Sequence, residues 1–135
     1  MNSKSVVQNY YNSNIEEITG NLNTFFHEDC CLHWNSSKGF LVLGFKELET
    51  FFNDLSSSYK QIRTEISHLL QEDNFVTTRY TTYGNTIENE DEEIALAHYM
   101  SIWEVKEGKL YKGYEISQLA DDYALKINSF AEIKI

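Results

Sequence analysis

The stretch that decides the fold is His98-Tyr-Met-Ser-Ile-Trp-Glu-Val-Lys-Glu-Gly-Lys-Leu-Tyr-Lys-Gly-Tyr-Glu-Ile116. It predicts two alternating strands joined by a turn at Lys106 to Lys109. Aromatic side chains recur along both strands, and Gly108 supplies the positive φ that a tight hairpin needs. A long aromatic hairpin near the end of a small domain is typical of a pocket wall. The stretch therefore favours a small-molecule site over a macromolecular groove.

The residues before this hairpin predict helices first. Ser5 and Gln8 have capping-box spacing, and apolar residues then recur with the helical period until Gly20. A short helix about 22–26 and a strand at 30–35 are expected next. The helix that follows Gly44 buries one apolar stripe, made of Leu48, Phe51, Phe52, Leu55 and Tyr59.

From Ile62 the period changes to two, which predicts strands. A turn at Glu72 to Asn74 and a strand through Tyr83 lead toward the aromatic hairpin, so four strands form an antiparallel meander. The residues expected on one face of the first of these strands are Ile62, Thr64, Ile66, His68 and Leu70.

Helices followed by antiparallel strands predict one α+β domain over residues 1–135, with its core at about 5–120. We expect a cone-shaped α+β barrel, in which the N-terminal helices pack against a strongly curved, mostly antiparallel sheet around a cavity. The tail at 121–135 ends in Phe130-Ala-Glu-Ile-Lys-Ile135, which alternates like a strand. Its role stays open between pairing with the sheet and covering the cavity mouth.

Charge and composition narrow the classes of partner. The chain has 21 acidic and 11 basic residues, a net charge of −10, and the basic residues are scattered. Nucleic acid and anionic membrane surfaces are therefore disfavoured, since both are held by clustered Lys and Arg. No apolar run reaches the ~20 residues of a membrane span, and the first residues lack the apolar core of a signal peptide. We expect a cytoplasmic protein.

The adjacent cysteines Cys30 and Cys31 are expected to be buried small hydrophobes, because neighbouring cysteines strain a disulfide and supply too few ligands for zinc. No pair of histidines has metal-ligand spacing with a supporting carboxylate. We therefore expect no metal and no cofactor.

Four segments carry a resemblance to a known family. They are Val6-Val-Gln-Asn-Tyr10, Phe26-His-Glu-Asp29, Gly44 before the third helix, and Trp103-Glu-Val-Lys-Glu-Gly-Lys-Leu110. Their order and spacing resemble the nuclear transport factor 2-like superfamily, within it the SnoaL-like polyketide cyclases and ketosteroid isomerases. The resemblance covers nearly all of residues 5–120. It implies a cofactor-free isomerase, cyclase or dehydratase type of enzyme acting on a carbonyl substrate.

The resemblance to the isomerases carries over only in part. Tyr10 matches their oxyanion tyrosine, whereas the general base falls at Trp34 and the second donor falls near Ser101. An indole has no lone pair with which to abstract a proton. The carboxylate of the family is therefore expected to be missing, and classical ketosteroid isomerisation is disfavoured.

The resemblance to the cyclases is also partial. Their acid at the end of the last strand falls on Gln118, and a tryptophan before it becomes Tyr114. His33 matches a histidine of their first strand, and an imidazole is suited to proton transfer near neutral pH. Strand alternation places His33 and Trp34 on opposite faces, and we favour Trp34 inward.

Three hypotheses follow. The first is an enzyme in which Tyr10 polarises a carbonyl and His33 moves the proton. The second is a non-catalytic module that binds a small apolar or cyclic molecule. The third is an assembly domain that forms a homodimer through the outer sheet face, where His98, Met100 and Ile102 are expected. The ligand-binding candidates, for all of which plain core packing is the competing explanation, are Trp34, Phe52, Tyr80, Tyr99, Ser101, Trp103, Tyr114 and Gln118.

Overall fold

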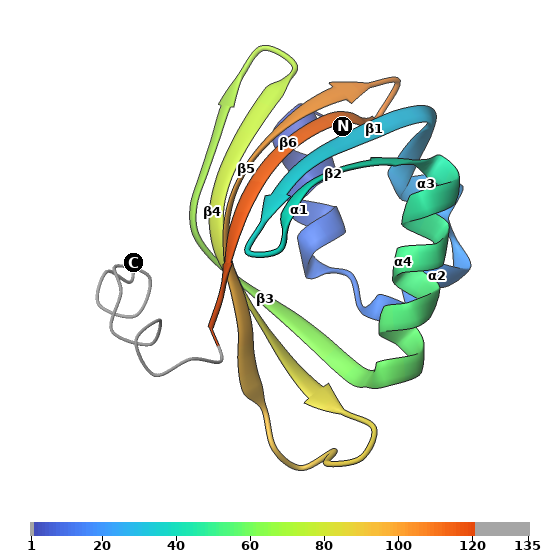
Figure 1. Cartoon of the computed structure of the whole chain (residues 1–135). Helices are drawn as coiled ribbons and strands as arrows, with labels where there is room; N and C mark the ends of the chain where they lie inside the picture. The colour runs from blue at the N-terminus through green and yellow to red at the C-terminus, as the bar shows by residue number, and fades with distance from the viewer. Residues whose placement is uncertain (1, 121–135) are drawn as a thin grey trace.

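A six-stranded sheet curves around the N-terminal helices and a longer helix from the middle of the chain (Figure 1). The computed structural model describes residues 2–120, so the expectations about 121–135 lie outside the described residues. The helices are α1 (Ser3–Asn12), α2 (Ile15–Gly20), α3 (Leu22–Phe25) and α4 (Phe45–Ser58). The strands are β1 (Phe26–Ser36), β2 (Gly39–Gly44), β3 (Tyr59–Glu72), β4 (Phe75–Thr86), β5 (Ile94–Lys106) and β6 (Lys109–Leu119). The predicted α+β class and the curved sheet against N-terminal helices are confirmed.

The strands lie in the order β2-β1-β6-β5-β4-β3. Strands β3 to β6 form the predicted antiparallel meander, because each pairs antiparallel with the next. Strand β1 pairs parallel with β6 and antiparallel with β2. Strand β6 therefore lies between the first strand and the aromatic strand β5, which brings residues far apart in sequence together at the centre of the sheet.

The first helical segment is two helices rather than the single one expected from Ser5 to Gly20. Asn2 caps α1 by accepting a hydrogen bond from the Ser5 amide at 2.8 Å, and Asn14 caps α2 by accepting from the Glu17 amide at 2.7 Å. Asn14 is extended, so it breaks the helix while the apolar spacing continues across the break. None of the described helices is long and apolar enough to cross a membrane.

The prediction that Ile62, Thr64, Ile66, His68 and Leu70 share one face of β3 is wrong beyond Ile66. The pairing of β3 with β4 shifts between Ile66 and His68. A shift of one residue exchanges the faces of everything beyond it. Leu69 consequently packs against the core, while the Leu70 side chain is 61% exposed.

The hairpin of β5 and β6 also contains a bulge. Lys106 pairs with Lys109 beside the turn, but Glu104 pairs with Lys112. Tyr111 is the extra residue and has no partner in this ladder. Each later residue of β6 therefore lies opposite the residue of β5 that is one position later in the sequence than an unbulged hairpin would place there.

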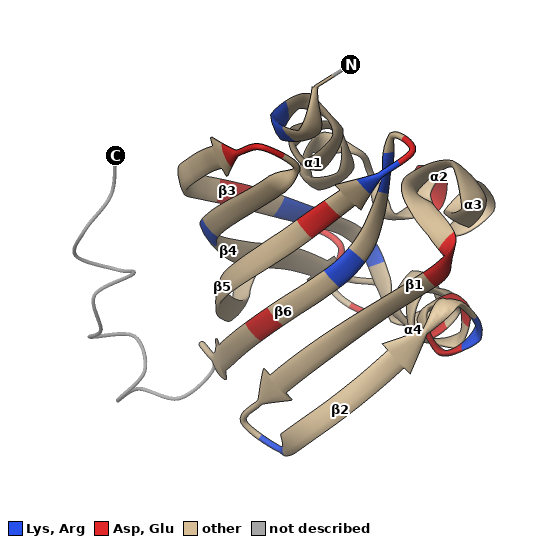
Figure 2. Ribbon diagram, turned by 90° about the horizontal axis from the view of Figure 1, so that it is seen from above, with Lys and Arg blue, Asp and Glu red and all other residues tan. Residues whose placement is uncertain are grey.

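Trp103 is the centre of the core between the sheet and the helices, at 2% exposure. Its cross-strand partner on β6 is Gly113. A Cβ at Gly113 would lie 2.5 Å from Trp103 Cζ3 and 2.8 Å from Leu32 Cδ1, so the indole occupies the space that a side chain would take. Viewed from above, lysines and arginines lie on several separate elements, interspersed with acidic residues (Figure 2).

Candidate functional site

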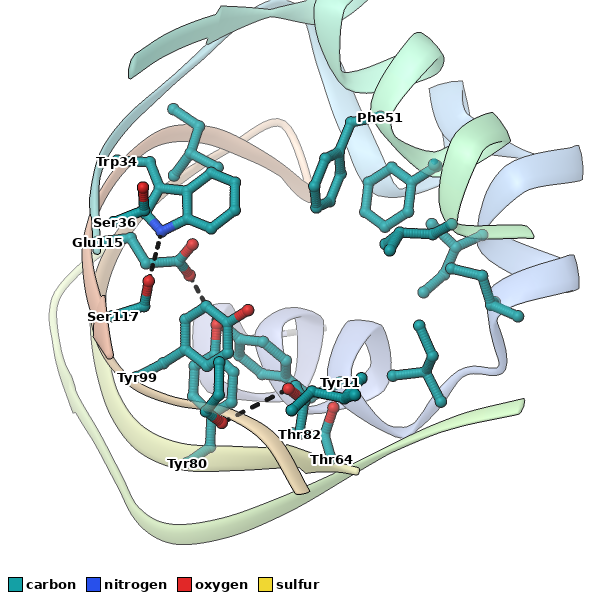
Figure 3. Close-up of a pocket in the computed structure, with 18 of the residues that line it drawn as sticks. Tyr11, Trp34, Ser36, Phe51, Thr64, Tyr80, Thr82, Tyr99, Glu115 and Ser117 are labelled. Atoms are coloured by element: carbon teal, nitrogen blue, oxygen red, sulfur yellow. Dashed lines mark hydrogen bonds between the residues drawn. The ribbon is translucent and has the colours of Figure 1, made fainter. Parts of the chain in front are cut away.

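The concave face of the sheet and the helices enclose a cavity of about 590 Å³ (Figure 3). Its wall is mainly aromatic and aliphatic, and every described helix except α3 contributes to it. Of the sequence-predicted ligand residues, the cavity wall contains Trp34, Phe52, Tyr80, Tyr99 and Trp103. The candidate catalytic residue Tyr10 also lines it. A cavity of this size fits a molecule of a few fused rings.

A carboxyl group that the sequence analysis missed lies in this wall. Glu115 on β6 directs its side chain into the cavity (Figure 3). Its Oε1 atom accepts a hydrogen bond from the Tyr80 hydroxyl at 2.6 Å and another from the Ser101 hydroxyl at 2.7 Å. Among the described residues, none donates to Oε2, which is not a buried atom. One oxygen is therefore held by the protein, and the other is available to a ligand.

Burial raises the pKa of Glu115 above the usual carboxyl value, although the hydrogen bonds from Tyr80 and Ser101 act in the opposite direction. The carboxyl group therefore keeps its proton to higher pH than an exposed glutamate does. A carboxyl oxygen has two lone pairs, and on Oε1 both accept hydrogen bonds. The proton of the neutral form consequently lies on Oε2, where it can be donated into the cavity.

The aromatic side chains around Glu115 are ordered by contacts with one another. The rings of Tyr80 and Tyr99 are stacked, with centroids 4.7 Å apart and planes 7° apart. The Trp34 indole donates to the Ser117 hydroxyl at 2.9 Å, and its ring meets the Phe51 ring edge-on at 5.5 Å (Figure 3). These contacts fix two broad apolar surfaces beside the carboxyl group.

Two consecutive tyrosines of α1 face the cavity but differ in their bonding. The Tyr11 hydroxyl accepts a hydrogen bond from Trp103 Nε1 at 3.1 Å, and its ring lies 4.5 Å from that of Tyr80. The Tyr10 hydroxyl has no hydrogen-bond partner among the described residues. Burial raises the pKa of Tyr10 well above the usual phenol value, so it stays a hydrogen-bond donor. Tyr10 is therefore a second available polar group in the wall.

His33, Tyr114 and Gln118 do not line the cavity. The expected positions of Tyr114 and Gln118 in the cavity are therefore wrong, and the hypothesis that His33 moves the proton, which required an inward His33, loses its basis. The His33 ring stacks on Tyr114 with centroids 5.0 Å apart, and its Nδ1 lies 3.2 Å from the Gly113 carbonyl oxygen. Tyr114 is 45% exposed, and Gln118 is also exposed. The preference for Trp34 inward agrees with the cavity wall, which excludes His33 as its neighbour on β1.

Ser101, another predicted ligand-binding residue, does not line the cavity itself. It is 2% exposed, and its hydroxyl contacts two residues of the cavity wall, Glu115 at 2.7 Å and the Tyr80 hydroxyl at 3.4 Å. In the sheet, Glu115 pairs with Trp34 on one side and with Ser101 on the other. These are the two positions at which the isomerase resemblance implied the base and second donor. Neither position carries a carboxylate, but a different carboxyl group, that of Glu115, lies on the strand between them.

No group of three or more His, Cys, Asp or Glu side chains within residues 2–120 is arranged to hold a metal ion. The polar groups that could orient a ligand in the described wall are hydroxyls, the Trp34 indole, Lys38 and Glu115. This set can donate hydrogen bonds to an oxygen and exchange one proton with a ligand.

Comparison with known families agrees with the fold. The model of the SnoaL-like domain matches residues 8–112. The chain belongs to this family. It thereby falls within the nuclear transport factor 2-like superfamily that the sequence segments resembled. A comparison with curated proteins gives no significant match.

Solved structures share the fold of this SnoaL-like domain at low sequence identity. A phenazine biosynthesis-related protein from Pseudomonas aeruginosa is 16% identical, with a TM-score of 0.67 over 96% of this chain and 77% of that one. IdmH, a proposed polyketide cyclase from Streptomyces antibioticus, is 14% identical, with a TM-score of 0.64 over 87% and 92%. An epoxide hydrolase from M. tuberculosis is 13% identical, with a TM-score of 0.66 over 85% and 81%. Relatives of this fold thus differ in chemistry.

Proposed function

We propose that this SnoaL-like protein is an enzyme that catalyses proton transfer at the carbon next to the carbonyl group of a small, mainly apolar cyclic substrate. In its carboxylate form, Glu115 takes a proton through Oε2 from the carbon next to the carbonyl group, and the neutral acid then returns that proton to the substrate. Tyr10 donates a hydrogen bond to the carbonyl oxygen and to the enolate oxygen that forms. The aromatic wall takes the ring system by apolar contact. The reaction is of the isomerase, cyclase or dehydratase type and needs no cofactor.

One observation carries the proposal: Oε1 of Glu115 is occupied by two hydroxyl donors, whereas Oε2 is open to the cavity. A purely structural glutamate would have both oxygens satisfied or exposed to bulk water. A buried acid with a raised pKa and one available oxygen is suited to exchanging a proton with a bound molecule. Tyr80 and Ser101 position it.

The first experiment is a thermal-shift screen of the purified protein against steroid ketones, planar phenols and polyketide-like aromatics, with short fatty acids as controls. A ligand at ~100 times its dissociation constant adds roughly 2.7 kcal/mol to the free energy of unfolding. Each ketone that raises the melting temperature is then incubated with the protein in deuterium oxide. Mass spectrometry measures the exchange of the hydrogens next to its carbonyl group for deuterium.

We expect catalysed exchange in the wild-type protein and a loss of about 10²–10⁴-fold in Glu115→Gln, since amides do not transfer protons at neutral pH. Glu49→Gln is the matched control, because Glu49 is an exposed residue of α4 outside the cavity wall. Exchange that survives Glu115→Gln would exclude this mechanism. Binding without exchange in any ketone would favour the non-catalytic module.

A homodimer through the outer sheet face is part of the proposal. Ile102 pairs with Tyr114 and Met100 with Ile116, which gives a block of four apolar side chains that are 45% to 60% exposed. A cross-strand pair of opposite charge, Glu104 and Lys112, lies beside this block. In a second copy related by a two-fold axis that passes between Glu104 and Lys112, each charge would lie opposite its complement. A ligand inside the cavity cannot cover this face.

A further inference from the structure

Apart from tyrosines, Glu115 and Lys38 are the only ionisable residues that line the described cavity. The chain has 21 acidic residues against 11 basic ones, yet a cation accompanies the single carboxyl group. Such a pairing of one acid and one base in an otherwise apolar wall is a pattern that a ligand's own charges can match.

The turn that carries Lys38 is held at the exposed end of the cavity. The Lys38 amide donates to Ser36 Oγ at 3.1 Å, and the Leu119 amide of β6 donates to Ser37 Oγ at 3.2 Å. Gly39 completes the turn with φ 121°, a conformation that favours glycine. Wall residues near this turn, among them Leu41 and Leu119, are 48% and 40% exposed, whereas Trp103 at the other end is 2% exposed.

No carboxylate of the described chain pairs with the Lys38 ammonium group. The other polar side chains of the wall outside the Glu115 network are the Trp34 indole and hydroxyl groups, namely those of Tyr10, Tyr11, Ser13, Ser36, Ser37, Tyr59, Thr64, Thr82, Tyr99 and Ser117. Hydroxyls and an ammonium group can donate to an anion without repelling it. The exposed end is therefore favourable to an anionic substituent, even though the protein as a whole is strongly acidic.

Lys38 and Glu115 are separated along the cavity. Glu115 lies beside Trp34 in the sheet, and Ser36 at the end of β1 is two residues beyond, roughly 7 Å further along the strand. Lys38 follows in the turn. A ligand that contacts both groups must span on the order of 10 Å, about two fused rings and their substituents.

We propose that the substrate class is the cyclic oxo-carboxylates: a ring system whose ketone group lies beside Glu115 and whose carboxylate is bound by Lys38 at the cavity mouth. This inference rests on the proposed function, because it takes Glu115 as the group that meets the ketone. Lys38 selects and orients the substrate and takes no part in proton transfer.

The test uses two probes with the same ring and ketone, 2-acetylnaphthalene and 6-acetyl-2-naphthoate. Their dissociation constants are measured by quenching of tryptophan fluorescence in wild-type protein, Lys38→Gln and Lys46→Gln. Lys46 on α4 lies outside the cavity wall, so its variant carries the same change in net charge without the contact.

We expect the naphthoate to bind Lys38→Gln about three- to fivefold more weakly than wild type, as for one exposed ion pair, while 2-acetylnaphthalene is unaffected. Lys46→Gln should bind both probes like wild type, and added salt should weaken only the naphthoate. Equal effects of Lys38→Gln and Lys46→Gln would overturn the role of Lys38 and leave the proposed function intact. If neither probe binds wild type, both proposals fail together.

Discussion

At the scale of single residues, Glu115 combines burial, two donors on one oxygen and an available second oxygen. These properties of the carboxyl group depend on one another. The donors keep a buried carboxyl group from being prohibitively unfavourable, and burial keeps its proton available. Because the donors are Tyr80 and Ser101, two neutral hydroxyls, the site gains no compensating positive charge. The neutral acid is therefore the form that this environment favours.

Glu115 makes stability depend on pH. Its folded-state pKa is raised above the unfolded value of 4.5, so its favourable contribution is complete below about pH 4.5 and is lost as pH rises through the folded pKa. Glu115→Gln removes this loss. We expect the melting temperatures of variant and wild type to be similar at pH 4 and the variant to become the more stable one toward pH 8. A difference that shrinks with rising pH would mean that the carboxyl group is stabilised as the anion.

Gly113 is the residue at which the core has least room. In Gly113→Ala the new methyl group would contact the Trp103 indole and Leu32, and relief requires the buried indole to move. Overpacking of this kind costs about 1–3 kcal/mol. Gly20→Ala is the control, because no atom lies within 4 Å of its added Cβ. Urea denaturation should show a lower free energy of unfolding for the first variant only; equal values for both would place Trp103 elsewhere.

At the scale of elements, the helices depend on asparagine caps. Asn14→Ala removes the acceptor for the Glu17 amide at the start of α2, and a lost cap of this type costs about 1 kcal/mol. Asn53→Ala on the exposed side of α4 is the control and should change stability by less than about 0.5 kcal/mol. Thermal denaturation of both variants measures the difference. Equal stability would mean that the break between α1 and α2 does not depend on this cap.

The element scale also shows what the sequence could predict. The period of apolar residues was sufficient for the order of helices and strands and for the meander, since burial requires that period. The face of each strand was predicted correctly only where the register has no extra residue. The Trp34 side chain enters the cavity as expected, because no bulge precedes it within the part of β1 that pairs with β2.

The site was predicted less well than the fold, and one residue explains most of the difference. Without the extra Tyr111, the turn at Lys106 to Lys109 would place Tyr114 and Gln118 on the inner face and Glu115 outside. With it, Glu115 is inside. Alternation alone cannot locate a bulge, because any residue near the turn can be the unpaired one. A signal was nevertheless present: Gly113 fits opposite Trp103, where a bulky side chain would not.

At the scale of the whole molecule, the two faces of the sheet have separate tasks in our proposals. The concave face binds the substrate, and the outer face binds a second copy. Ile116→Lys places a charge in the apolar block and should convert a dimer into a monomer in light scattering coupled to size-exclusion chromatography. Leu70→Lys, on β3 and also exposed, should stay dimeric. A wild-type protein that is monomeric at all concentrations would exclude this interface.

The unpaired Tyr111 also bears on how such a protein changes over generations. Deletion of one codon at this hairpin would reverse the two faces of β6. The side chains that now point into the cavity would point outward, and those that point outward would enter the cavity. An acid would leave the interior while a phenol entered, and the apolar outer block would be altered in the same event. The length of this hairpin thus determines which side chains of β6 line the cavity. A substitution on β6 changes one side chain at a time, whereas a change of hairpin length replaces the whole catalytic face and forces a new activity or none.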